Sequence, residues 1–284
     1  MSHNHPLLNN KDYEAPSLLT PENLLREARR QRNVPTAPVP AVCVLDPDGD
    51  IARYLARTGR GRHHQGWACY HTEMWTTELD GIEVGVVGMA VGAPFAVLVA
   101  EQLAASGCDL TISVTASGQI SPLGELPYFL LIERALRDEG TSAHYLPAGQ
   151  WSYLDRELGG RLEHAFDGLS EPVFTGSSWT TDAPYRETAT AIAAAKAEQI
   201  ACVEMEAAGL YAYAQATGAA VVCVAHLTNT MATDGDDFEK GADNGVHDAL
   251  AVIRAIATAL EGECWATGNS GSETSSTTTS IRGR

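Results

Sequence analysis

Short apolar runs and longer segments with helical spacing alternate along the middle of the chain. The short runs predict strands, and apolar positions three or four residues apart predict helices. Strands are expected over residues 41–45, 82–87, 110–114, 129–133, 173–176, 201–203 and 219–226, and helices over 51–55, 94–105, 188–199, 207–217 and 247–260. This alternation is typical of an α/β three-layer sandwich with a mixed central sheet.

The two ends of the chain differ from this middle part. Thr20, Pro21 and Glu22 are typical of a helix start, with an N-cap threonine, a first-position proline and an acid in the first turn. A short basic helix is expected to follow as far as Arg32. Residues 268–284 are rich in Gly, Ser and Thr and lack apolar anchors, which predicts disorder. The predicted regions are an N-terminal extension at 1–40, a folded domain at 41–263 and a disordered tail at 264–284.

Charge and cysteine content narrow the functional classes. The 284 residues carry a net charge of −17 with only 19 Lys and Arg, which argues against nucleic acid and anionic membrane as partners. No apolar run is long enough to span a bilayer, and no signal peptide is recognisable. The six cysteines lack metal-ligand spacing and favour a reducing, cytoplasmic location.

Two carboxylates interrupt a segment that otherwise has the pattern of a buried core. Glu204 and Glu206 lie between the apolar strand at 201–203 and the small-residue helix at 207–217. A buried ionised carboxylate needs partners, because its desolvation is costly. The hydroxyls of a sugar would serve, and so would a buried arginine in a structural ion pair. The residues alone leave both alternatives open.

Residues 203–209, Val-Glu-Met-Glu-Ala-Ala-Gly, resemble the ribose-binding segment of the nucleoside phosphorylase superfamily. Three further segments agree with that family in order and spacing: residues 78–103, 112–120 and 138–145. The resemblance covers about residues 41–260 and is closest to the uridine phosphorylase-like branch. It implies the phosphorylase type of α/β fold, cleavage of a nucleoside at its N-glycosidic bond, and a homo-oligomer.

The resemblance also implies roles in holding the sugar. Glu206 would accept hydrogen bonds from the ribose 2′ and 3′ hydroxyls, Met205 would pack against the sugar, and Glu204 would support both from behind. A carboxylate below the sugar stabilises the positive charge that develops as the glycosidic bond breaks. Glu206 is therefore the first catalytic candidate.

Base recognition is expected from two segments, with Thr181, Asp182, Arg186, Thr228 and Asn229 as candidates. Asn229 stands where purine-cleaving members have an aspartate, which favours a pyrimidine. Arg186 would stabilise the departing pyrimidine anion, so that Arg186 and Asn229 complete the catalytic set. The alternatives are an ion pair at a helix start for Arg186 and a loop-capping amide for Asn229.

The phosphate site of the family is degenerate in this sequence. The loop at 46–50 carries three acids, its nearest cation is displaced by several residues, and serine replaces the arginine of the central strand. Phosphate binding prefers guanidinium groups or backbone N–H groups free of nearby negative charge. The positions equivalent to the phosphate site are Asp46, Asp48, Gly49, Arg53, His71, Ser113, Ala116 and Ser117.

The preferred interpretation is a nucleosidase, in which water replaces phosphate and Asp46, Asp48, Asp50 or His71 orients it. One alternative is a true phosphorylase whose anion site is rebuilt from Arg53, Arg57 or His71. Another is a non-catalytic nucleoside-binding protein. A small-molecule nucleoside is the expected ligand, and neither an organic cofactor nor a metal is implied. His144 and His226 are expected near the cavity, with His144 the preferred functional candidate, and the histidines at 63–64 are expected in a surface loop.

Overall fold

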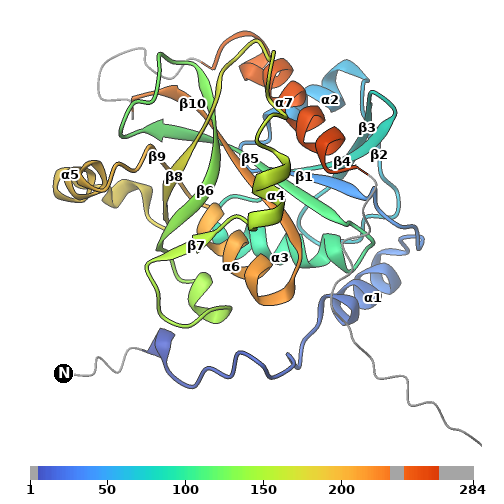
Figure 1. Ribbon diagram of the computed structural model, residues 1–284. Coiled ribbons are helices and arrows are strands. Elements are labelled where there is room, and N and C mark those ends of the chain that lie inside the picture. Colours follow the sequence, from blue (N-terminus) through green and yellow to red (C-terminus); the bar gives the residue numbers. More distant parts are fainter. Residues whose placement is uncertain (1–5, 231–239, 262–284) are drawn as a thin grey trace, which may run out of the picture.

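A ten-stranded mixed sheet forms the middle layer of the computed structural model, which describes residues 6–230 and 240–261 (Figure 1). The strand order is β10-β6-β8-β9-β5-β1-β4-β3-β2, and β7 pairs with β6. The strands are β1 (Val42–Asp46), β2 (Arg62–His63), β3 (Met74–Leu79), β4 (Ile82–Gly88), β5 (Leu110–Gln119), β6 (Tyr128–Asp138), β7 (Trp151–Tyr153), β8 (Val173–Thr181), β9 (Cys202–Glu204) and β10 (Ala220–Asn229).

Part of the sheet closes on itself around β5. This strand pairs in parallel with β1 and β10 and antiparallel with β9, while β10 also pairs with β6. The parallel ladder of β5 and β10 ends with Gly118 beside Asn229, and Gly118 is also the partner of Val203 on β9. The ring therefore brings the carboxyl ends of β5 and β10 next to the Glu204–Glu206 segment.

Helices cover both faces of the sheet, as the sequence predicts. Helices α3 (Ala93–Ala104) and α6 (Ala207–Thr217) pack on one face, and α2 (Asp50–Thr58) and α7 (Val246–Ala259) pack on the other (Figure 1). Strand β5 contributes Ile112 and Val114 to the apolar cluster that includes residues of α7. Gly209 lets α3 and α6 approach closely, since a Cβ there would lie 2.7 Å from the Cβ of Ala93.

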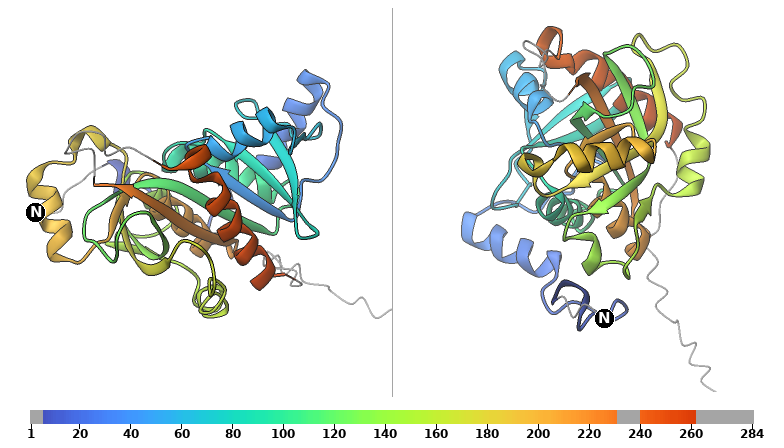
Figure 2. Two further views of the ribbon diagram at one scale, coloured as in Figure 1. Left: turned by 90° about the horizontal axis from the view of Figure 1, so that it is seen from above. Right: turned by 90° about the vertical axis from the view of Figure 1, so that its left-hand side faces the viewer.

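The remaining helices lie at the periphery. Helix α1 (Pro21–Arg32) starts where predicted, with the Thr20 hydroxyl accepting a hydrogen bond from the Asn23 amide, and it packs against α3. Helix α5 (Ala189–Ala197) extends from one end of the sheet, as Figure 2 shows. The short helices are η1 (Pro6–Leu8), η2 (Ser142–His144), α4 (Arg156–Arg161), η3 (Pro184–Arg186) and η4 (Ala242–Gly245). None of the helices in the described ranges is long and apolar enough to span a membrane.

Four strands are longer than their apolar patterns predict. β5, β6, β8 and β10 each continue by several residues beyond the expected ends at 114, 133, 176 and 226. The added residues include Thr115, Ser117 and Thr180, which the sequence pattern did not assign to strands because they are polar. Ring closure gives their backbones partners, so the strands persist. The tail predicted at 264–284 lies outside the described residues.

Candidate active site

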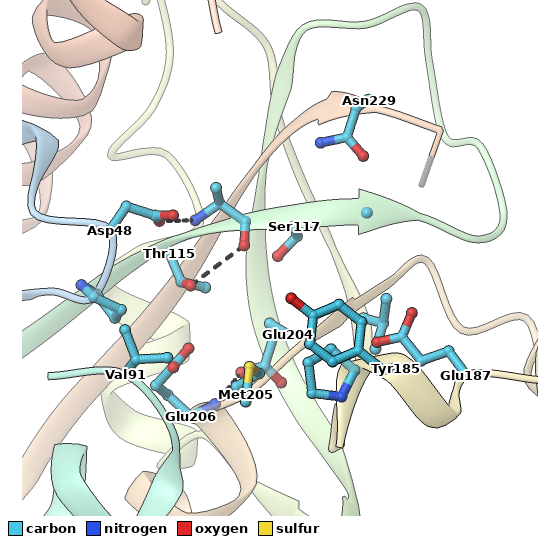
Figure 3. Close-up of a pocket in the computed structure, with 15 residues that line it drawn as sticks. Asp48, Val91, Thr115, Ser117, Tyr185, Glu187, Glu204, Met205, Glu206 and Asn229 are labelled. Carbon is cyan, nitrogen blue, oxygen red and sulfur yellow. Dashed lines mark hydrogen bonds between the residues drawn. The ribbon is translucent and has the colours of Figure 1, made fainter. Parts of the chain in front are cut away.

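A cavity of about 410 Å³ lies where β5, β9 and β10 end and α6 begins. Figure 3 shows Asp48, Val91 and Glu206 on one side of it and Tyr185 and Glu187 on the other. The full lining comprises Pro47, Asp48, Val91, Thr115, Ala116, Ser117, Gly118, Pro184, Tyr185, Glu187, Val203, Glu204, Met205, Glu206 and Asn229.

Glu204 is buried, and both its oxygens are occupied. Oε1 accepts from the hydroxyls of Ser178 at 2.9 Å and Thr180 at 2.5 Å, and Oε2 accepts from the amides of Glu206 and Ala207, both at 2.7 Å. The two amides belong to the start of α6, so this carboxylate caps the helix. Burial raises the pKa of Glu204, and these four hydrogen bonds oppose the shift. Its partners are hydroxyls and amides instead of an arginine.

Glu206 has one satisfied oxygen and one open oxygen. Oε1 accepts from the Gly92 amide at 2.7 Å, whereas Oε2 is buried and has no hydrogen-bond partner among the described residues. The Thr115 hydroxyl donates to the carbonyl of Ala116 at 3.3 Å, and it also lies close enough to the Glu206 carboxylate to lower the pKa of Glu206. Burial and the charge of Glu204 raise the pKa of Glu206 to about 8. Such a buried acceptor calls for a ligand that donates a hydrogen bond.

A second polar atom of the cavity lining is also unsatisfied. The Ser117 hydroxyl is buried and lies next to the Cys202 thiol, but it makes no hydrogen bond of ordinary geometry in the described part of the chain. Met205 and Asn229 complete this part of the lining. Sugar hydroxyls, which donate and accept, match the combination of a carboxylate oxygen and a serine hydroxyl.

The acidic loop after β1 is held together by its own contacts. Asp46 is 3% exposed and accepts from the amides of Gly49 at 3.1 Å and Ala52 at 2.9 Å, which caps α2. Burial, with the neighbouring acids, raises the pKa of Asp46 to about 7. Gly49 adopts φ of 74°, a conformation that suits glycine. Asp46 and Gly49 therefore shape the loop from outside the cavity lining.

Two cations form ion pairs with the acids of this loop. Lys240 lies 2.8 Å from Asp50 and 3.2 Å from Asp48, and Arg53 lies 2.6 Å from Asp50. Burial alone would lower the pKa of Lys240, but Asp48 and Asp50 outweigh it and raise that pKa. The hydrogen bonds from Lys240 and Arg53 in turn lower the pKa of Asp50 against the effect of burial. The sequence pattern gave no reason to single out Lys240, which is 190 residues from Asp50 along the chain.

Asp48 is the one acid of this loop that lines the cavity. Its Oδ2 accepts from the backbone amide of Ala116 at 2.7 Å (Figure 3). Its Oδ1 lies 3.2 Å from the Lys240 ammonium. The expected phosphate-site residues are thus divided. Asp48, Ala116 and Ser117 meet in the cavity, whereas Ser113 is buried four residues before Ser117 on β5 and lies outside the lining.

The segment that was predicted to recognise the base presents different side chains to the cavity from those expected. Arg186 is exposed and outside the lining, and Asp182 accepts from the Gly140 amide at 2.9 Å. Thr181 accepts from the Ala183 amide at 3.2 Å, and the buried Thr228 also lies outside the lining. In their place η3 turns Pro184, Tyr185 and Glu187 toward the cavity. Burial raises the pKa of Glu187. Tyr185 and Glu187 were missed from the sequence, and their positions on either side of Arg186 were the one feature that could have pointed to them.

His71 and His144 lie outside the cavity lining, whereas His226 lines the small void beside Asp48 and Lys240. His71 is exposed and packs edge-on against Phe95, 6.1 Å between ring centroids. His144 is exposed and bonded to Lys11 at 2.7 Å. His226 is buried, stacks on Phe129, and has its pKa lowered to about 4 by burial and by Lys240. Across residues 6–230 and 240–261, no group of three or more His, Cys, Asp or Glu is arranged to hold a metal ion.

The amino-acid sequence is similar to those of known nucleoside phosphorylases. A family model described as "Phosphorylase superfamily" matches residues 41–260. The chain is 26% identical to uridine phosphorylase of Thermococcus kodakarensis, over 72% of this chain and 83% of that protein. It is 25% identical to guanosine phosphorylase of Halorubrum lacusprofundi, over 64% and 78%.

Solved structures share the fold at lower sequence identity. Uridine phosphorylase of Vibrio fischeri superposes with a TM-score of 0.65 at 19% identity, covering 78% of this chain and 91% of that one. Purine nucleoside phosphorylase of Toxoplasma gondii gives a TM-score of 0.65 at 17% identity over the same shares. The expected α/β fold with a mixed central sheet is confirmed.

Proposed function

The chain belongs to the phosphorylase superfamily, and we propose that it cleaves the N-glycosidic bond of a ribonucleoside. The open Oε2 of Glu206 carries the proposal, because it is a buried acceptor in a cavity large enough for a small ligand. The vicinal hydroxyls of ribose would supply the missing donors. Once ionised, Glu206 would also stabilise the positive charge that forms on the sugar as the base departs.

The departing base must be stabilised as well. Asn229 lies in the cavity wall and is suited to hydrogen bonding with the base, although a carboxamide cannot act as a general acid. The expectation of a pyrimidine depended partly on Arg186, which lies outside the lining. Glu187 instead offers a carboxylate, which accepts hydrogen bonds from base N–H groups. Both uridine and guanosine phosphorylases occur among the relatives, so we keep both bases in the substrate panel.

Water is the acceptor that we favour. Ser113 and Ala116 replace the polar and cationic groups expected for phosphate, and the loop beside them is acidic. Of the acids proposed to orient a water, only Asp48 lines the cavity. Phosphorolysis remains the second candidate, because Lys240 supplies a cation within 3.2 Å of Asp48. His71, exposed on its own chain, would act only if one subunit of a homo-oligomer lends it to the next.

The test is release of free base from uridine, cytidine, adenosine, inosine and guanosine, with and without inorganic phosphate. Release that is indifferent to phosphate and yields free ribose would support hydrolysis. Release that requires phosphate and yields ribose 1-phosphate would overturn the choice of water and support phosphorolysis. Saturable nucleoside binding without turnover at high protein concentration would overturn catalysis and leave a nucleoside-binding protein.

A further inference from the structure

We propose that the carboxylate of Asp48 occupies the binding position of an oxyanion, so that the protein's own side chain excludes phosphate from the cavity. The inference rests on the proposed function for its catalytic meaning, but its binding claim can be tested without any nucleoside. It makes Asp48 the residue that determines the choice of acceptor.

The contacts of Asp48 are those of a bound oxyanion. One oxygen accepts from the Ala116 backbone amide at 2.7 Å, and the other lies 3.2 Å from the Lys240 ammonium. Backbone amides and cationic side chains are the groups with which proteins hold phosphate. The Lys240 side chain is only 15% exposed, so its charge is directed at the acids around it. We call these two donors, the Ala116 amide and Lys240, the oxyanion cradle.

The oxyanion cradle opens toward the sugar end of the cavity. Asp48, Ala116 and Glu206 line the same space, and Figure 3 shows Asp48 and Glu206 on the same side of it. The charge of Asp48 adds a small contribution to the raised pKa of Glu206, after the larger contributions of burial and of Glu204. An anion in the cradle would therefore lie beside the sugar, where an acceptor must be to attack it.

The space behind the cradle accommodates water but little else. A void of about 30 Å³ lies between Asp48, Asp50, His226 and Lys240. A buried water needs roughly 10–15 Å³ of such space and several polar partners. Phosphate would have to displace the Asp48 carboxylate, and it would then approach the charge of Asp50 as well. A neutral water meets neither obstacle.

The other cations near the loop cannot take over the role of the cradle. Arg53 donates to Asp50 at 2.6 Å and to the Asp48 carbonyl at 2.8 Å, and it lies outside the cavity lining. Arg57 is engaged by Asp243 at 2.8 Å. Phosphate affinity should thus depend on Lys240 once Asp48 is removed.

The experiment measures binding of inorganic phosphate to the full-length chain by isothermal titration and by ³¹P NMR, with no nucleoside present. The wild type should show no saturable binding at millimolar phosphate, whereas Asp48→Ala should bind it. Adding Lys240→Met to Asp48→Ala should weaken that binding by about tenfold or more, since an ionic hydrogen bond is lost. Asp48→Asn keeps the shape of the side chain without its charge and should bind phosphate more weakly than Asp48→Ala. Circular dichroism and thermal unfolding establish that each variant is folded.

Two results would overturn the inference. One is wild-type phosphate binding as tight as that of Asp48→Ala, and the other is absence of binding in Asp48→Ala and Asp48→Asn when both are folded. Base release by the same variants, with and without phosphate, separates the two proposals. Phosphate binding by Asp48→Ala together with no base release by any variant or by the wild type would leave the cradle standing and refute the proposed function.

Discussion

The segments at 46–48 and 204–206 have the same local arrangement, but their second acids differ in whether both carboxylate oxygens have a partner. Each has two acids separated by one residue, at the junction between a strand and the following helix. The first acid of each pair, Asp46 or Glu204, caps that helix. The second acid, Asp48 or Glu206, lines the cavity. The same local arrangement, in which a helix-capping acid is followed two residues later by an acid that lines the cavity, therefore occurs twice.

The second acids differ in how they are satisfied. Both oxygens of Asp48 have partners, in Ala116 and Lys240, whereas Oε2 of Glu206 has none among the residues described. Leaving a buried acceptor without a donor is costly, so Glu206 can gain a hydrogen bond from a ligand, whereas Asp48 already has its partners within the protein. Function therefore depends on the partners that each acid finds, more than on the acids themselves.

The largest effect is expected at the open carboxylate. Glu206→Gln should lower kcat/KM for base release by about 10²–10³-fold, as is typical when one charge-stabilising group is lost. Its amide oxygen can still accept from the Gly92 amide, so urea unfolding below about pH 4.5, where the Glu206 carboxyl is protonated in the folded and the unfolded state, should be little changed. A kcat/KM close to that of the wild type would remove Glu206 from the proposed mechanism.

The pH dependence is the next largest effect. Glu206 has a pKa near 8 and must be ionised to stabilise positive charge, so kcat/KM should rise with pH and fall about tenfold per unit below that pKa. Because the folded state then holds a proton that the unfolded state loses above about 4.5, Glu206 should also make stability decrease as pH rises from 4.5 to 8.

A matched variant identifies the group behind this pH profile. The pKa of Asp46 is also raised, to about 7, but Asp46 lies outside the cavity lining. In Asp46→Asn, the rise of kcat/KM with pH should still have its midpoint near pH 8. In Glu206→Gln, this rise should be absent. A rise of kcat/KM with pH that persists in Glu206→Gln and is lost in Asp46→Asn would assign the titration to Asp46.

The helix-capping acid should affect stability first. Glu204→Gln replaces one acceptor oxygen by an NH2 group facing donors, so the free energy of unfolding should fall by about 1–3 kcal/mol. Urea unfolding measures this change. Full stability with a large loss of kcat/KM would instead show that Glu204 acts on the ligand directly.

Two serines on one face of β5 allow a smaller, matched comparison. The hydroxyls of Ser117 and Ser113 are both buried and unpartnered within the described ranges, but only Ser117 lines the cavity. Ser117→Ala should reduce kcat/KM by about three- to tenfold, the value of one hydrogen bond, with stability nearly unchanged. Ser113→Ala should leave kcat/KM as it is. Equal effects of the two variants would contradict a role for Ser117 in binding.

The smallest effects are expected at the base end. Arg186→Ala should change kcat/KM by less than about twofold for every nucleoside, because an exposed charge interacts weakly with the cavity. Glu187→Gln should alter the ranking of the bases, lowering kcat/KM most for those that present N–H donors. Kinetics over the nucleoside panel distinguish the two. A uniform loss in Arg186→Ala would restore that arginine to the site.

The sequence by itself determined most of the framework. Helix α6 runs from Ala207 to Thr217 as its small-residue pattern predicts, and α1 begins at the predicted N-cap. Seven of the ten strands and the helices that cover the sheet also follow from the apolar pattern, since periodicity and capping depend on near neighbours along the chain, whereas β2, β3 and β7 were not predicted. The pair Glu204 and Glu206 was recognisable for the same reason.

Only the tertiary structure decided which polar atoms have partners. Lys240 reaches Asp48 from 192 positions further along the chain, and Gly92 reaches Glu206 across 114. The polar ends of β5 and β10 remain strands because the ring of strands pairs them, and η3 turns Tyr185 and Glu187, instead of Arg186, toward the cavity. Such contacts depend on how distant segments pack in space, which a local pattern of apolar and polar residues does not encode.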